Sequence, residues 1–327
     1  MIGFLNVRKP AGPSSHDLVA AARRRLGRDV KVGHCGTLDP FAEGVLVLCV
    51  GAATRLASYV QRQPKRYLAT LTLGASSTTD DPTGTITPLA QPAGPAGGES
   101  APPVPPTGEQ LRSAIAGFVG EIRQRPPAHS AVHVEGRRAY KLARRGEAVE
   151  IPERTVTVHS IEVLRYDYPL VEIDVRCGGG TYIRALARDI GAALGTAAYC
   201  SRLIRTEIGV FRMDEAIPVE DIDPAKNLLP ALWAIGGIPW ITLSESDCAS
   251  IRTGRSVHVS TGNVDSAKAD GKPSVDFGTE EMQREIAILD TGGNLVAIAN
   301  AESVEASIAE VSVAEVVLRP RIVLSNT

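Results

Sequence analysis

Residues 33–55, GHCGTLDPFAEGVLVLCVGAATR, join a loop rich in reactive side chains to a long apolar run. The run at 45–50 is too apolar for a half-exposed strand, so it predicts a strand buried on both faces. Four side chains before it could do chemistry: His34, Cys35, Asp39 and Glu43. The loop also contains Gly36 and Pro40, which restrict how it can fold.

These four side chains allow several kinds of site. A nucleophilic Cys35 needs a base that faces it, and its neighbour His34 points elsewhere in a strand or a helix. The spacing of His34, Asp39 and Glu43 matches no common metal site. Asp39 precedes Pro40, which favours an extended backbone. On these residues alone, a structural Asp-Pro turn explains Asp39 better than a catalytic carboxylate does.

The surrounding segments predict a mixture of strands and helices. Ser15 is the expected N-cap of a helix over 16–27, and TGEQ at 107–110 fits a capping box before another helix. LVEIDVRC at 170–177 predicts a strand, and TYIRALARDIGAALG at 181–195 predicts a helix with one apolar stripe. Residues 65–74, KRYLATLTLG, alternate as a strand does.

Composition divides the chain into two parts. We expect one domain over 1–235, with a disordered Pro/Gly-rich insertion at 89–106, and a small β-rich domain over 236–327. Residues 1–68 hold 11 Lys and Arg against 4 Asp and Glu, whereas 236–327 hold 7 against 13. A polyanion should therefore bind the N-terminal part. The alternative is that Arg23, Arg24 and Arg25 form a solvated helix face.

The five cysteines form no C-x-x-C pair, which indicates reduced thiols in a cytoplasmic protein. We find neither a signal peptide nor a membrane span in the sequence.

Two residues far from the opening stretch point to a site. Arg184 lies in the first turn of the predicted helix, where the helix dipole disfavours a cation. It should therefore have an anion nearby, unless its long side chain extends into water. Tyr67 follows Lys65 and Arg66 on a predicted strand, and such a basic edge with an aromatic ring suits stacking on an unpaired base. The alternative is a tyrosine of the core.

Four blocks of the chain resemble the TruB-type tRNA pseudouridine synthases of bacteria. They are GHCGTLDPFAEGVLVLCVGAATR, KRYLATLTLGASSTTDDPTG, PPAHSAVHVEGRRAYKLARRGE and CGGGTYIRALARDIGAALGTAAYCSRLIRTEIGVF, and they extend over about residues 1–215. The resemblance implies an α+β fold with a central mixed or antiparallel sheet flanked by helices. It also implies isomerisation of uridine 55 in the tRNA T loop, without a cofactor or a metal.

The resemblance also implies roles for single residues. Asp39 matches the catalytic aspartate, Tyr67 the tyrosine that packs on the target base, and Arg184 the arginine that pairs with the carboxylate. Such a pairing would lower the pKa of Asp39 and keep it charged. Further matches concern substrate binding: Tyr182 and Leu203 would line the uridine pocket, His34 would hold the opened T loop, and Asp81, beside Asp80, would join a polar network. Arg55, at the end of the first block, is also expected to contact the substrate.

For the C-terminal part, the resemblance suggests a PUA-like RNA-binding domain, although its negative charge also fits a role in packing alone. We expect a monomer that acts on the T arm of tRNA, with no membrane and no obligate protein partner. Three rivals remain: a tRNA-binding or folding chaperone with a structural carboxylate, a synthase that depends on a guide RNA, and a hydrolase built on Cys35.

Overall fold

A computed structural model describes residues 1–89, 104–127, 133–134, 137–138, 151–260, 285–308 and 311–324. Its main feature is a nine-stranded sheet in the order β1-β3-β12-β4-β11-β10-β7, with β2 paired to β3 and β13 paired to β12. The strands are β1 (Gly3–Lys9), β2 (Val32–His34), β3 (Glu43–Val50), β4 (Lys65–Leu73), β7 (Gly120–Gln124), β10 (Arg154–Asp167), β11 (Leu170–Cys177), β12 (Ala198–Ile208) and β13 (Phe211–Arg212). The β3–β12 pair is parallel and the others are antiparallel, so the sheet is mixed, as expected.

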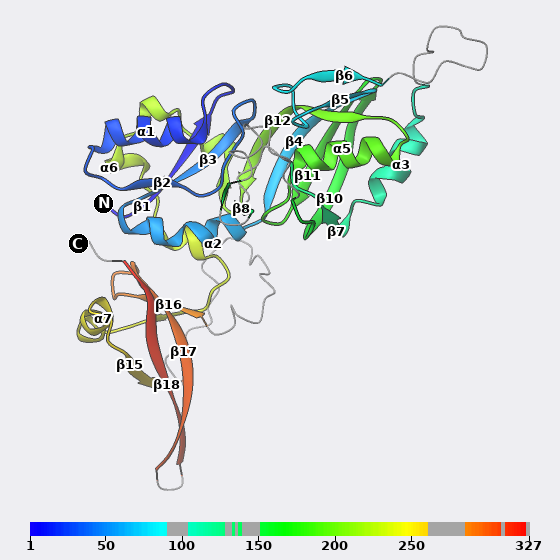
Figure 1. Cartoon of the computed structure of the whole chain (residues 1–327). Coiled ribbons are helices and arrows are strands. Elements are labelled where there is room, and N and C mark those ends of the chain that lie inside the picture. The colour runs from blue at the N-terminus through cyan, green and yellow to red at the C-terminus, as the bar shows by residue number, and fades with distance from the viewer. Residues whose placement is uncertain are drawn as a thin grey trace, which may run out of the picture.

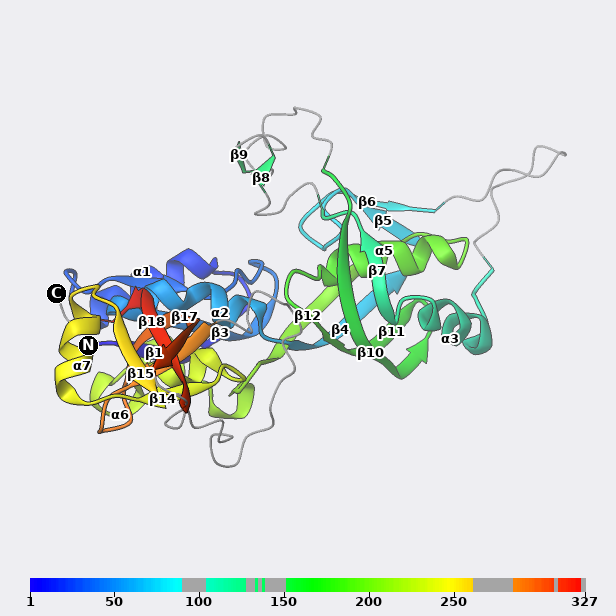
Figure 2. The ribbon, with the colours of Figure 1, turned by 90° about the horizontal axis from the view of Figure 1, so that it is seen from below.

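Helices pack against this sheet at two places (Figure 1). One is α1 (Ser15–Leu26), whose buried Leu18, Ala22 and Leu26 contact the strands near the N-terminus. At the second place, α3 (Gly108–Ala116) and α5 (Ile183–Ala193) cover the part of the sheet that is farther from α1 (Figure 2). The expected stripe on α5 is present, because Ile183, Leu186, Ala187 and Ile190 are all buried. The sheet and its helices confirm the α+β class.

Shorter elements connect these parts. They are the 3-10 helices η1 (Gly51–Leu56), η2 (Met213–Glu215), η3 (Val219–Asp221) and η4 (Ala231–Ile235), the helices α2 (Ala57–Arg62) and α6 (Pro224–Asn227), and the strand pairs β5 (Ala75–Ser77) with β6 (Ile86–Pro88) and β8 (His133–Val134) with β9 (Arg137–Arg138). Most of the predicted insertion at 89–106 lies outside the described residues. Among the described residues, no helix is long and apolar enough to cross a membrane.

The C-terminal part is a second sheet in the order β14-β16-β17-β18-β15. It comprises β14 (Trp240–Thr242), β15 (Val257–Ser260), β16 (Glu285–Leu289), β17 (Leu295–Ile308) and β18 (Val311–Val323), with α7 (Glu245–Arg252) packed on it. Figure 1 shows this sheet beside α2, on the side of the molecule that carries the N-terminus. The β-rich character predicted after residue 236 is therefore confirmed.

Two local predictions were wrong. The N-cap of α1 is Ser14 rather than Ser15, because Asp17 lies three residues after Ser14 and completes a capping box with it. The strand that holds Tyr67 is central rather than a basic edge, since β4 lies between β12 and β11. Its two basic neighbours point to opposite faces: Lys65 is buried, and Arg66 forms ion pairs with Asp174 and Glu207.

Candidate active site

The loop at residues 36–42, hereafter the Asp39 loop, connects β2 to β3 and is held by its backbone. Ser15 donates its hydroxyl to the carbonyl of Leu38 and accepts the Leu38 amide, both at 2.9 Å. Lys9, which is fully buried, donates Nζ to the carbonyls of Pro40 at 3.1 Å and Ala42 at 2.6 Å. Such contacts fix the backbone on both sides of Asp39, so the carboxylate is presented by a restrained loop.

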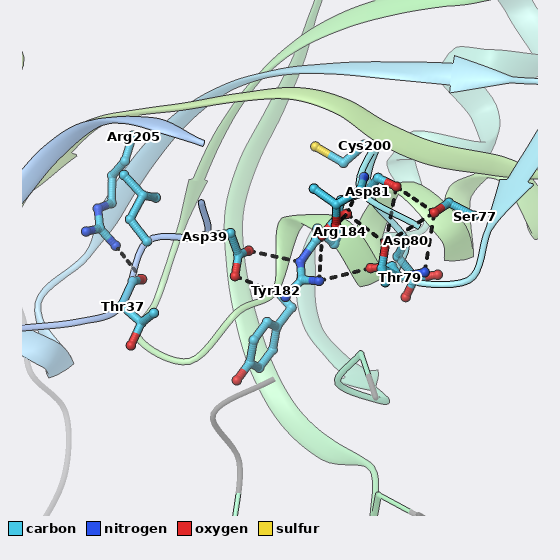
Figure 3. Close-up of polar contacts among 12 residues, drawn as sticks. Thr37, Asp39, Ser77, Thr79, Asp80, Asp81, Tyr182, Arg184, Cys200 and Arg205 are labelled. Atoms are coloured by element: carbon cyan, nitrogen blue, oxygen red, sulfur yellow. Dashed lines mark hydrogen bonds and ion pairs between the residues drawn. The ribbon is translucent and has the colours of Figure 1, made fainter. Parts of the chain in front are cut away.

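Asp39 forms an ion pair with Arg184. The Nε of Arg184 lies 2.9 Å from Oδ2 of Asp39, and Nη2 donates to Oδ1 at 3.2 Å, so two nitrogens of the guanidinium face two oxygens of the carboxylate (Figure 3). The side chain of Arg184 is only 3% exposed, whereas that of Asp39 is 29% exposed. The anion expected near the start of α5 is therefore the Asp39 carboxylate, which remains partly exposed to solvent.

Asp81 holds the other side of the same guanidinium. Its Oδ2 accepts from Nη1 of Arg184 at 2.9 Å, while Oδ1 accepts from Thr79 Oγ1 at 2.7 Å and from the amide of Thr83 at 2.9 Å. The carbonyl of Thr79 also accepts from Nη1 of Arg184, at 2.9 Å. Arg184 is thus bound between two carboxylates, and the Asp81 end of the arrangement is buried.

The neighbouring carboxylate, Asp80, faces a different arginine. It has a positive φ of 58°, and its Oδ2 accepts from Nη1 of Arg188 at 2.8 Å. Adjacent residues with different backbone conformations therefore send their side chains to Arg184 and to Arg188. The sequence alone leaves the choice between them open, and the structure assigns Asp81 to the network around Asp39.

The environment of Asp39 affects its protonation. Burial raises the pKa of Asp39 above its ordinary value, while the Arg184 guanidinium acts in the opposite direction and the Asp81 carboxylate adds to the rise. The expectation that Arg184 lowers the pKa of Asp39 is correct for the effect of Arg184 alone. It is wrong for the net shift, because burial raises the pKa by more than Arg184 lowers it. Arg184 therefore limits how far the pKa of Asp39 rises.

Tyr67 and Leu203 come from adjacent strands and pack in one apolar cluster with Leu38 and Ala42. Tyr67 is 6% exposed, and burial raises the pKa of its hydroxyl to about 12, so the phenol is neutral at physiological pH. Leu203 is 4% exposed. The two side chains give the site an apolar wall within the same core cluster as the Asp39 loop.

Tyr182 is the N-cap residue of α5, and Gln124 holds its backbone. The amide of Tyr182 donates to Oε1 of Gln124 at 2.7 Å, and Nε2 of Gln124 donates to the Tyr182 carbonyl at 3.0 Å. The guanidinium of Arg154 lies 4.8 Å from the centre of the tyrosine ring, which is a cation–π contact. In Figure 3, the ring of Tyr182 lies below the Asp39–Arg184 pair.

His34 and Arg55 belong to β2 and η1, which hold none of the ion-paired side chains described above. His34 is the last residue of β2, and its ring meets that of His16 edge to face, with centroids 5.1 Å apart. Arg55, in η1, donates Nη1 to the carbonyl of Val323 at 2.6 Å, so it contacts the C-terminal sheet. This contact gives no support to the expected role of Arg55 in substrate binding.

The other reactive side chains of the opening stretch have structural surroundings. Cys35 is fully buried, and a hydrogen bond with Cys49 together with burial raises the pKa of its thiol above the ordinary value. Glu43 forms an ion pair with Arg202 at 3.3 Å. Within the described part of the chain, no three His, Cys, Asp or Glu side chains are grouped so as to hold a metal ion.

Sequence reasoning did not identify three residues that support the Asp39 loop: Lys9, Ser15 and Arg205. Arg205 is 2% exposed and donates to carbonyls of Gly36 and Thr37, both at 3.2 Å. Each of the three acts on backbone atoms of a segment far away in the sequence. A backbone acceptor carries no residue signature, so no motif could have indicated these contacts.

Known proteins are similar to this chain over most of its length. Residues 23–183 match the family model of the TruB family pseudouridylate synthase, N-terminal domain. The tRNA pseudouridine synthase B of Trichormus variabilis is 38% identical over 297 residues, which are 88% of this chain and 97% of that protein. That of Leifsonia xyli is 41% identical over 263 residues, 79% of this chain and 84% of that protein.

Two solved structures are also similar to this chain. The chain matches a structure described as a Cbf5-Nop10-Gar1 complex with a TM-score of 0.68 and 26% identity, over 99% of this chain and 85% of that chain. It matches an H/ACA RNP bound to a substrate RNA containing 2'-deoxyuridine with a TM-score of 0.66 and 25% identity, over the same shares of the two chains. The fold, the site and these similarities together show that the chain belongs to the TruB family of pseudouridylate synthases.

Proposed function

We propose that this protein isomerises uridine to pseudouridine in tRNA, at position 55 of the T loop, with Asp39 as the catalytic carboxylate. The observation that supports this most is the Asp39–Arg184–Asp81 arrangement, in which a buried cation orients a carboxylate that is still reachable. The names of the curated relatives, tRNA pseudouridine synthase B, support the substrate and the reaction.

The reaction requires the target base outside its stack. A base within a folded loop cannot be detached, turned and rejoined, and extruding it costs a few kcal/mol. Tyr67 and Leu203 supply an apolar surface against which the extruded base can pack, and Tyr182 lies at the same site. His34 is suited to occupy the gap that the base leaves in the T loop. These roles follow from the family resemblance and the placement of the residues.

The chemical step begins at the glycosidic bond. The C1′–N1 bond breaks, the base rotates, C5 bonds to C1′, and the proton on C5 is lost while N1 gains one, so the overall change is an isomerisation. Two routes use the ionised Asp39: attack as a nucleophile on the sugar or the base, and removal of the C2′ proton. Both need the carboxylate charged and held in one direction, which is what Arg184 provides.

We further propose that the protein works alone in the cytoplasm as a monomer, without a metal, an organic cofactor or a guide RNA. Residues 1–235 would form the catalytic domain and 236–327 a PUA-like domain. The negative balance of the C-terminal part favours few phosphate contacts there.

The test is tritium release from an unmodified tRNA transcript that carries [5-³H]uridine. The wild-type protein should release tritium without added RNA or protein. Asp39→Ala and Asp39→Asn should lower the rate by at least about 10⁴-fold, because the reacting carboxylate is lost, while binding of the transcript stays within a few-fold. Glu43→Gln is the matched control from the same segment, and it should keep activity within a few-fold because Glu43 contacts Arg202.

The rival functions predict different results. A tRNA-binding chaperone would show no release by the wild type, or equal release by Asp39→Ala. A guide-dependent synthase would be inactive on the bare transcript and gain activity with a guide RNA. A hydrolase based on Cys35 would lose activity in Cys35→Ser, whereas we expect that variant to retain it because the thiol is buried and protonated.

A further inference from the structure

Arg205 is a buried cation that donates to three backbone carbonyls and also forms a hydrogen bond with the side chain of Tyr67. Its Nε donates to Val45 at 2.8 Å, and its two Nη atoms donate to Thr37 and Gly36, both at 3.2 Å. Its side chain is among the largest that are fully buried. Within the described residues, no carboxylate lies at ion-pair distance from it. Burying a charge without a counter-charge is costly, so this arrangement calls for an explanation beyond packing.

The sheet places Arg205 beneath the Asp39 loop. In the parallel β3–β12 pair, Arg205 lies opposite Gly44, and a Cβ atom on Gly44 would collide with the Arg205 carbonyl. In the antiparallel β4–β12 pair, Arg205 lies opposite Tyr67, and such partners share a face of the sheet. The side chain therefore enters the space between Tyr67 and the start of the Asp39 loop.

Two guanidinium groups consequently flank the loop. In Figure 3, Arg205 lies on one side of the segment from Thr37 to Asp39 and contacts Thr37, while Arg184 lies on the other side and contacts the Asp39 carboxylate. The charged groups that act on Asp39 are Arg184, Asp81, Arg205 and Lys9. Arg184 is shared between Asp39 and Asp81, so the positive charges of Arg205 and Lys9 add to the balance of the two carboxylates.

We propose that Arg205 is a positioning residue for Asp39, which ties the start of the Asp39 loop to β3 through the carbonyls of Gly36, Thr37 and Val45 and supplies a buried positive charge that favours the ionised carboxylate. This inference rests on the proposed function. It assigns two separable properties to one side chain: the geometry of the loop, which needs the planar fork of a guanidinium, and the charge, which a lysine also has.

The experiment compares Arg205→Met and Arg205→Lys with the wild type, in single-turnover tritium release between pH 4.5 and 8. Because Asp39 must be ionised, the rate falls as the pH drops through its pKa. Arg205→Met should lower the maximal rate by about 100-fold, the loss expected when a reacting group is displaced by about 1 Å. Its acid limb should move to higher pH, since a cation that favours the carboxylate is gone. The KM for tRNA should stay within a few-fold.

Arg205→Lys should keep the acid limb at the wild-type pH and recover part of the rate, because it restores the charge without the fork. Arg202→Met is the matched control: Arg202 lies on the same strand, is exposed and pairs with Glu43, so neither rate nor acid limb should move. A wild-type rate and acid limb in Arg205→Met would overturn the proposal, as would a loss confined to KM. A wild-type rate in Arg205→Lys would overturn the geometric part.

A second measurement distinguishes a failure of the proposed role of Arg205 from a failure of the proposed function. The ¹³C carboxyl resonance of Asp39, assigned with Asp39→Asn, can be titrated in the protein without RNA. Its pKa should be higher in Arg205→Met than in the wild type, and an unchanged value would overturn the electrostatic part even if the wild type proves inactive on tRNA. If Arg205→Met does not fold, Arg205→Lys carries the test, with an unchanged acid limb and a rate about tenfold lower expected.

Discussion

Two adjacent carboxylates, Asp80 and Asp81, bind different arginines of one helix. Asp81 is 4% exposed and anchors Arg184, whereas Asp80 turns toward Arg188 through a backbone with positive φ. Removing the Asp81 charge would take away one of the two carboxylates that pair with the buried Arg184 among the described residues. Removing the Asp80 charge would remove the ion pair with Arg188, whose side chain is 34% exposed, and leave the ion pairs of Arg184 with Asp39 and Asp81 in place.

Asp81→Asn should therefore reduce the tritium-release rate by about 100-fold, because Arg184 is free to shift and take Asp39 with it. Asp80→Asn is the matched control, since asparagine tolerates positive φ as aspartate does, and it should stay within a few-fold of the wild type. Both variants are assayed at saturating tRNA with unfolding curves recorded in parallel. Equal losses in the two variants would show that the choice between these carboxylates does not matter.

The site residues differ in how far the sequence predicts them. Arg184 could be predicted to need an anion because a cation in the first turn of a helix is unfavourable locally. Tyr67 could be placed on a strand, but its position in the sheet could not, because strand order depends on distant pairings. Arg205 gave no local signal, since its partners are carbonyls about 160 residues away along the chain.

Among the elements, β3 and the loop before it depend on one close contact with β12. Gly44 has φ +112° and lies directly opposite Arg205, so it lacks both the room and the backbone conformation for a side chain. Helix boundaries and caps were predictable where they follow local rules, as in the Thr107–Gln110 capping box before α3. The requirement for glycine at position 44 comes from a strand that arrives much later in the sequence.

Gly44→Ala should lower the free energy of unfolding by about 4 kcal/mol or more, because backbone strain adds to a collision with the main chain of β12. Gly120→Ala is the matched control. Gly120 has a similar φ of +104° but nothing within 4 Å of an added Cβ, so it should cost only about 2 kcal/mol of strain. Urea unfolding monitored by circular dichroism measures both. Equal losses would mean that the contact with β12 adds nothing to the strain.

At the scale of the whole molecule, the C-terminal sheet shares a hydrophobic core with the part that contains the nine-stranded sheet. Ala287, Leu289 and Ile298 of that sheet pack in one cluster with Val47 and Leu56. The sequence predicts a β-rich C-terminal part from its short apolar runs. The sequence does not predict that the C-terminal sheet packs on α2 and η1. The residue pattern of these two segments does not distinguish a surface that packs on another sheet from a surface that faces solvent. Arg55 and Tyr59 belong to this contact, through Val323 and Glu285.

Tyr59 should hold the two parts together. Its hydroxyl donates to the Glu285 carboxylate, with both oxygens at 3.0 Å, and burial together with Glu285 raises the pKa of the phenol to about 12. Glu285 is 3% exposed and also pairs with Arg321. Tyr59→Phe removes a donor from this buried carboxylate, so it should lower the free energy of unfolding by about 2 kcal/mol.

Because the core is shared, the wild type should unfold in a single transition that includes both sheets, and Tyr59→Phe should move that transition to lower urea concentration. Tyr199→Phe, a half-buried tyrosine of β12 in the other sheet, is the control and should change the midpoint far less. Tryptophan fluorescence reports on the contact between the two sheets through Trp233 and Trp240, which both pack against the shared cluster. Two separate transitions in the wild type would contradict the prediction of a single transition. A common core requires the C-terminal sheet and the nine-stranded sheet to lose their structure together.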